Sequence, residues 1–142
     1  MPATPASAEP RRARGRPRRL APEAVLDAAL TLFEDEPAAE FTLGRLARRL
    51  GVPVTSLYTC FPNRDALLDA AADRVFARFD WKPTPRAPWT EVLLSWMHAV
   101  QRHFQRYPIA QQLLSWDRRI SPAWLRVLDR HRFLSHRVQA PT

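Results

Sequence analysis

The sequence predicts an all-α fold, in which three short helices are joined by a long fourth helix to a second helical unit. Apolar residues recur at spacings of three and four through most of the chain after residue 20, as in helices with one buried face. Fourteen prolines against three glycines indicate that Pro rather than Gly separates these helices. No segment alternates apolar and polar residues over the length of a strand, so we expect neither β-strands nor repeats.

The chain divides into four parts. Residues 1–19 are rich in Pro, Ala and Arg and lack apolar periodicity, which predicts a disordered basic arm. Residues 20–80 form the first helical domain. Residues 81–88 contain three prolines and form a stiff linker. Residues 89–142 form a second, partial helical domain.

The first two helices have recognisable starts and ends. The first runs from Pro22, which suits the first helical turn, to Asp35, shortly before Pro37. The second begins behind Thr42, whose hydroxyl can accept a hydrogen bond from an unpaired backbone N–H of the first turn. It ends at Gly51, because glycine tolerates the left-handed conformation that closes many helices.

The remaining helices are placed by caps and by prolines. A short helix is expected over residues 53–61, and a long one from the N-cap Asn63 to about residue 80. In the second domain we expect helices over residues 89–106, 109–116 and 122–132.

The formal net charge of +8 favours a polyanionic partner and salt-sensitive binding. The charge is uneven, because residues 1–20 carry +5, residues 21–80 carry −4 and residues 81–142 carry +7. The first helical domain is therefore acidic overall, and charge alone is a weak argument for what it binds. The Arg-rich second half also fits a genome-wide preference for arginine.

Several classes of protein are disfavoured by what the sequence lacks. It has no apolar run of membrane-spanning length and no apolar core of a signal peptide near its start, so we expect a cytoplasmic protein. A single cysteine excludes an internal disulfide, and no Cys or His spacing predicts a metal site. No catalytic motif or phosphate loop predicts an enzyme or a cofactor. A polar cleft with titratable groups within residues 88–134 would favour an enzyme instead.

Ala47, Gly51 and Leu57 have the spacing of a helix-turn-helix. Two short helices that cross steeply leave room for only a small side chain, which Ala47 supplies. Gly51 tolerates the positive φ of the turn, and Leu57 fills the gap between the helices. An ordinary pair of antiparallel helices is the alternative that this spacing alone leaves open.

The run FTLGRLARRLGVPVTSLYTCFPNRDALLDAAADRVF, residues 41–76, resembles the TetR family of transcriptional regulators. The resemblance covers about residues 18–80 closely and residues 88–130 more loosely. It implies a ligand-responsive repressor that binds a palindromic operator through a recognition helix at about residues 53–60. The matching motifs are Leu50-Gly51-Val52, Leu57-Tyr58-Thr59-Cys60-Phe61, Arg64 and Leu67-Leu68.

The resemblance implies two kinds of contact with double-stranded operator DNA. The start of the recognition helix would face base edges in the major groove, and these residues are Pro53, Val54, Thr55 and Ser56. Other side chains would contact phosphates or the groove wall, and these are Thr42, Tyr58, Thr59 and Arg64. In the basic arm, Arg16, Arg18 and Arg19 would lie in a minor groove or along phosphates, and a solubilising tail is the alternative.

Two positions depart from a typical helix-turn-helix of this family. Cys60 stands where the family commonly has His, and we interpret it as a small packed hydrophobe rather than a redox sensor. Gly44 lies in the first turn of its helix and weakens that helix by up to about 1 kcal/mol relative to Ala.

In the family, the helices after the fourth form a ligand-binding and dimerising domain. The resemblance therefore implies a small apolar effector and a homodimer. The candidate pocket residues are Trp96, Met97, Phe104, Trp116 and Trp124, with plain core packing as the alternative for each. The chain is shorter than family members, so we expect the usual dimerisation helices to be missing. A non-regulatory remnant or a helical protein-interaction module is the competing hypothesis.

Overall fold

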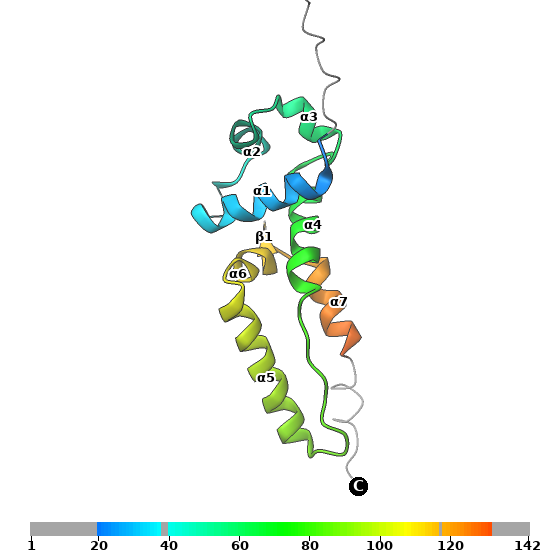
Figure 1. The fold of residues 1–142 in the computed structure, drawn as a ribbon. Coiled ribbons are helices and arrows are strands. Elements are labelled where there is room, and N and C mark those ends of the chain that lie inside the picture. The colour runs from blue at the N-terminus through cyan, green and yellow to red at the C-terminus, as the bar shows by residue number, and fades with distance from the viewer. Residues whose placement is uncertain (1–19, 38–39, 117, 132–142) are drawn as a thin grey trace, which may run out of the picture.

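A computed structural model describes residues 20–37, 40–116 and 118–131 (Figure 1). The predicted basic arm, with Arg16, Arg18 and Arg19, lies outside these residues. The described chain is helical apart from one very small sheet, which confirms the all-α class. In chain order the elements are α1 (Pro22–Asp35), α2 (Leu43–Leu50), α3 (Val54–Tyr58), α4 (Arg64–Phe76), α5 (Trp89–Arg106), α6 (Ile109–Leu114), β1 (Ser115–Trp116), β2 (Arg119–Ile120) and α7 (Pro122–Arg130).

The predicted side-chain caps account for the starts of α2 and α4. Thr42 Oγ1 accepts a hydrogen bond from the backbone N of Arg45 at 3.2 Å, at the start of α2. Asn63 Oδ1 accepts one from the backbone N of Ala66 at 2.8 Å, at the start of α4. The predicted bounds of α1 and α5 are confirmed.

Two helices of the first domain, α3 and α4, are shorter than predicted. Pro53 has an extended ψ of 142° and acts as the N-cap of α3. At the other end of α3, the backbone N–H groups of Cys60 and Phe61 both point back to Leu57 O at 2.9 Å. α4 ends at Phe76 rather than near residue 80, because the N–H of Phe79 bonds to Phe76 O in a tighter turn.

The expectation of no β-strands is wrong, because β1 and β2 pair in antiparallel register. Ser115 lies opposite Ile120, and Trp116 lies opposite Arg119. The helix predicted over residues 109–116 therefore ends at Leu114. Strands of two residues are too short to produce a visible alternation of apolar and polar side chains, so sequence periodicity could not detect them.

Residues 81–88, predicted as a linker, lie against the second domain. Trp81 and Ala87 are buried there, with exposed fractions of 7% and 8%. Trp81 Nε1 donates a hydrogen bond to Ser95 Oγ at 3.1 Å, and the Trp81 ring lies 5.0 Å from the Trp96 ring. Figure 1 shows this segment running beside α5. Trp81 and Ala87 therefore belong to the core, while residues 82–86 between them are exposed.

α4 joins the two halves of the described structure. It contacts α1 near one end of the molecule, and α6 and α7 further along (Figure 1). Its buried residues are Leu67, Leu68, Ala71, Ala72, Val75 and Phe76. Among the described helices, none is both long enough and apolar enough to cross a membrane.

An aromatic cluster forms the core of the second half. The Phe79 ring lies 5.1 Å from Trp96 and 5.8 Å from Trp124, and Phe76 lies 5.2 Å from Trp124. Two histidines belong to this cluster, since His103 lies 5.5 Å from Phe79 and His131 lies 5.2 Å from Trp96. Burial lowers the pKa of both histidines below the ordinary value of 6.5.

We predict that the protein loses stability as pH falls from 7.5 to 5.5. Because the folded chain holds the His103 and His131 protons more weakly than the unfolded chain does, the unfolded state binds protons first below about pH 6.5. Thermal unfolding at a series of pH values measures this loss. His103→Phe keeps a planar ring and should flatten the dependence, whereas the same change at exposed His98 should not. Equal slopes for both variants would contradict the assignment to His103.

Candidate nucleic-acid interface

α2 and α3 form the predicted helix-turn-helix. Ala47 is 4% exposed and Leu57 is fully buried, so both face the interior between the helices. Gly51 has φ 66°, in the left-handed region that the sequence predicted. The backbone N–H of Gly51 donates to Arg48 O at 3.2 Å and that of Val52 to Ala47 O at 3.0 Å, which closes α2.

The outer side of α3 is open to solvent (Figure 1). Val54 is 37% exposed and Tyr58 is 52% exposed, and the Thr55 side chain is exposed between them. Ser56 is half-buried. The Thr59 hydroxyl donates to Ser56 O at 2.7 Å, which leaves its oxygen as an acceptor. A short helix with one buried leucine and several exposed small polar groups can present hydrogen-bonding groups to a flat or grooved surface.

Two arginines of α2 are paired with the acidic end of α1. Arg45 Nη2 lies 2.8 Å from Glu36 Oε1, and Arg49 Nη1 lies 3.1 Å from Asp35 Oδ2. Both partners of each pair lie within residues 21–80, so these pairs neutralise part of the charge of α2 and leave the net charge of the segment at −4. Since all four side chains are substantially exposed, the pairs contribute little to stability.

Arg64 has a structural contact that sequence reasoning missed. Its Nε donates to Phe41 O at 3.1 Å, which ties the start of α4 to the segment before α2. One Nη lies 4.0 Å from Asp65 Oδ1. Thr42 lies next to Phe41 and is exposed. The phosphate contacts expected for Arg64 and Thr42 stay predictions.

Cys60 lies half-buried at the end of α3. Its Sγ donates to Leu20 O at 3.3 Å and lies 3.9 Å from Thr59 Oγ1. The thiol therefore holds the residue that precedes α1 against the end of α3, a contact between positions forty residues apart.

The five predicted pocket residues have different surroundings. Trp96 and Trp116 are buried, and Phe104 and Trp124 pack in the aromatic cluster with ring centroids 5.7 Å apart. Met97 is 56% exposed on the outer side of α5. None of the five lines either of the two cavities described in this structure. An apolar effector pocket among them stays a prediction.

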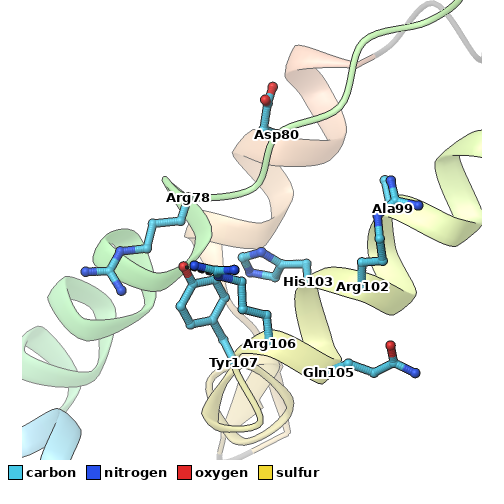
Figure 2. A pocket seen from close by; sticks show the side chains of 8 residues that line it. All are labelled: Arg78, Asp80, Ala99, Arg102, His103, Gln105, Arg106 and Tyr107. Atoms are coloured by element: carbon cyan, nitrogen blue, oxygen red, sulfur yellow. Dashed lines mark hydrogen bonds between the residues drawn. The ribbon is translucent and has the colours of Figure 1, made fainter.

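A polar cavity of about 580 Å³ lies instead between the end of α4 and the last turns of α5 (Figure 2). Its lining residues are Arg78, Asp80, Ala99, Arg102, His103, Gln105, Arg106 and Tyr107. Sequence reasoning missed this site. The only signal was the spacing of Arg102 and Arg106, which places both on one face of a helix.

Comparison with known proteins gives matches that include the helix-turn-helix. Residues 25–71 match the family described as "Bacterial regulatory proteins, tetR family". The tetracycline repressor protein class A from transposon 1721 of Escherichia coli is 38% identical over 78 residues, which are 54% of this chain and 36% of that protein. An HTH-type transcriptional repressor of Mycobacterium tuberculosis is 28% identical over 109 residues, 75% of this chain and 41% of that one.

Two solved structures are also similar. The TetR family protein ActR of Streptomyces coelicolor, in complex with (S)-DNPA, has a TM-score of 0.60 at 26% identity, covering 78% of this chain and 55% of that one. A TetR variant from Acinetobacter baumannii AYE, in complex with minocycline, has a TM-score of 0.60 at 27% identity, covering 83% and 67%. The chain spans less than half the length of the curated relatives it matches.

We predict that Ala47→Leu destabilises the helix-turn-helix. A larger side chain at this buried position forces α2 away from its neighbours, at a cost of about 1–3 kcal/mol. Urea unfolding of the full chain measures the change. The matched control is Ala24→Leu, on the exposed side of α1, where we expect a change below about 0.5 kcal/mol. Similar losses for the two variants would contradict tight packing at Ala47.

Proposed function

Because this chain belongs to the TetR family of bacterial regulatory proteins, we propose that it is a ligand-responsive transcriptional repressor that binds a palindromic operator. The observation that carries the proposal is the exposed side of α3. Its buried side is fixed by Leu57, and the left-handed turn at Gly51 sets its direction relative to α2. Such a helix fits the major groove of B-DNA.

The exposed side chains of α3 divide by chemistry. Thr55 and Ser56 can donate to or accept from base edges, and Val54 can contact a thymine methyl group. Tyr58 is long and half exposed at the end of the helix, so its hydroxyl is suited to a phosphate at the groove wall. Pro53 precedes α3 and has no backbone N–H, so it leaves no unpaired donor at the start of this helix.

Phosphate contacts at the other side of the helix-turn-helix are assigned to Thr42 and Arg64. Both lie beside Phe41, because Arg64 Nε bonds to Phe41 O. This contact holds the starts of α2 and α4 at a constant separation. A backbone clamp of this kind supports the register of the domain along DNA without reading its sequence.

A homodimer is supported by exposed apolar side chains on α5. Trp89 is 60% exposed, Leu94 55% and Met97 56%, and Leu93 lies between them. Large apolar groups gathered on one helix favour contact with another chain. A second copy would present two copies of α3 to two half-sites, as a palindrome requires. The same apolar side chains favour the second candidate function, a helical protein-interaction module.

Binding rather than catalysis is proposed for the polar cavity. Its lining contains one carboxylate, Asp80, and no Ser or Cys, so it holds neither a carboxylate pair nor an activated nucleophile. The matched relatives are named as repressors and regulators. Responsiveness to a small ligand is supported by the two similar structures, both described as complexes with small molecules.

We predict that selection of bound sites from random DNA returns a palindromic sequence with one half-site for each copy of α3. Gel-shift titrations of the selected site against scrambled DNA measure the preference. Recovery of no enriched sequence would contradict the repressor and favour the interaction module.

Two variants that each remove one hydroxyl separate the two kinds of contact. Thr55→Val keeps the side-chain shape and should change the preferred base at one position of each half-site. Tyr58→Phe keeps the ring and should weaken binding by about fivefold on every sequence, since one hydrogen bond contributes about 1 kcal/mol. The same loss for both variants on all sequences would contradict the division.

We predict that the full chain is a dimer by light scattering at micromolar concentration. Leu94→Glu places a charge within the exposed apolar side chains of α5 and should shift the protein towards monomer. Gln111→Glu adds the same charge at an exposed position of α6 and should leave the dimer intact. A monomeric wild-type chain, or equal effects of the two variants, would contradict this surface.

A further inference from the structure

The polar cavity lies where the chain leaves α4 and passes the last two turns of α5. Arg78 and Asp80 come from the segment after α4, and Arg102, Arg106 and Tyr107 come from α5 and its end. Figure 2 shows the side chains of Arg78, Arg106 and Tyr107 close together, with the His103 ring beside them. The site thus joins two elements that are distant in sequence.

The lining is strongly cationic. It contains three arginines, Arg78, Arg102 and Arg106, against the single carboxylate of Asp80. Within the part of the chain that the structure describes, none of these three arginines forms an ion pair. Arginines elsewhere in that part, such as Arg49 and Arg74, pair with aspartates at about 3 Å. Although Asp80 lies in the same lining, these three arginines are therefore not paired with it or with another described carboxylate.

Tyr107 orients two of the guanidinium groups. Arg106 Nε donates to Tyr107 Oη at 3.2 Å. The guanidinium carbons of Arg78 and Arg106 lie 5.4 Å and 5.7 Å from the centre of the Tyr107 ring. The Arg106 hydrogen bond, helped by the charges of both arginines, lowers the pKa of Tyr107. The ring thus holds two planar donors near one another before any ligand arrives.

His103 adds a buried polar group to the same wall. Only 5% of the residue is exposed, and its Nε2 has no hydrogen-bond partner among the described residues. Because this nitrogen is buried and the ring packs against Phe76 and Phe79, His103 forms a rigid back wall behind the arginines rather than an exposed donor.

We propose that this cavity binds the oxyanion of a small molecule, a carboxylate or a phosphate, between Arg78 and Arg106 beside the Tyr107 ring. Planar guanidinium groups match the two oxygens of such an anion, and a charge-assisted pair is about twice as strong as a neutral hydrogen bond. A volume of about 580 Å³ leaves room for an organic group behind the anion. The effector expected from the sequence was apolar, so the cavity points to a different ligand class.

The cavity is placed to affect DNA binding, a consequence that rests on the proposed function. Arg106 and Tyr107 also line a second cavity of about 280 Å³, together with Phe33 and Glu34 at the end of α1. An anion that moves Arg106 therefore acts on a side chain next to the helix-turn-helix domain. Arg78 follows α4, whose start is tied to Phe41 by Arg64.

The test is isothermal titration calorimetry of the full chain with benzoate, phenyl phosphate and the neutral benzamide. We expect saturable binding of one anion per chain for benzoate or phenyl phosphate, and none for benzamide. The anion with the lower dissociation constant identifies the class of oxyanion, carboxylate or phosphate. Failure of both anions to bind saturably, or equal binding of benzamide, would overturn the proposal.

Variants locate the site. Arg78→Gln combined with Arg106→Gln should raise the dissociation constant at least about tenfold. Arg86→Gln removes an exposed arginine outside the cavity and should change it less than about twofold. Circular dichroism checks that each variant is folded, and the changed side chains are all exposed. Equal losses in the cavity variant and in Arg86→Gln would show diffuse charge attraction and overturn the site.

Gel shifts with and without the anion separate this proposal from the proposed function. If the chain binds the anion but no DNA, the anion site is supported and the proposed repressor function is wrong. If the chain binds DNA but no anion, the proposed anion site is wrong and the repressor function is supported. Binding of both with no change in operator affinity overturns the regulatory consequence alone.

Discussion

The burial of α4 on several sides is the constraint on which the rest of the molecule depends. Leu67, Leu68, Ala71 and Ala72 are all fully buried, because α1 packs on one part of the helix and α6 and α7 on another. A helix shared by two cores cannot tilt without disturbing both of them. The position of the helix-turn-helix is therefore set by the same side chains that hold the second half in place.

Small side chains make this sharing possible. Ala71 and Ala72 let neighbouring helices approach α4 closely, while Phe76 at its end reaches into the aromatic cluster. The same principle applies inside the helix-turn-helix, where Ala47 is the small residue and Leu57 the large one. Alternation of small and large groups across facing helices gives a dense interior without strain.

The distribution of charge is clearer in three dimensions than along the chain. Part of the acidic surplus of residues 21–80 is neutralised from the second half, since Arg126 pairs with Asp73 of α4. The basic surplus of residues 81–142 is partly gathered in the cavity beside Tyr107. Net charge by segment therefore described neither surface well, because it does not show which charges pair and which like charges lie together.

The sequence by itself determined the helical class, the bounds of α1 and α5, and the Ala47–Gly51–Leu57 motif, because caps, prolines and a positive φ act within a few residues. Only the tertiary structure decided the roles of Trp81, Arg64 and Arg78. Each of these depends on a partner more than ten residues away, such as Ser95 for Trp81 and Phe41 for Arg64. Local periodicity carries no information about such contacts, since they arise from how complete helices pack.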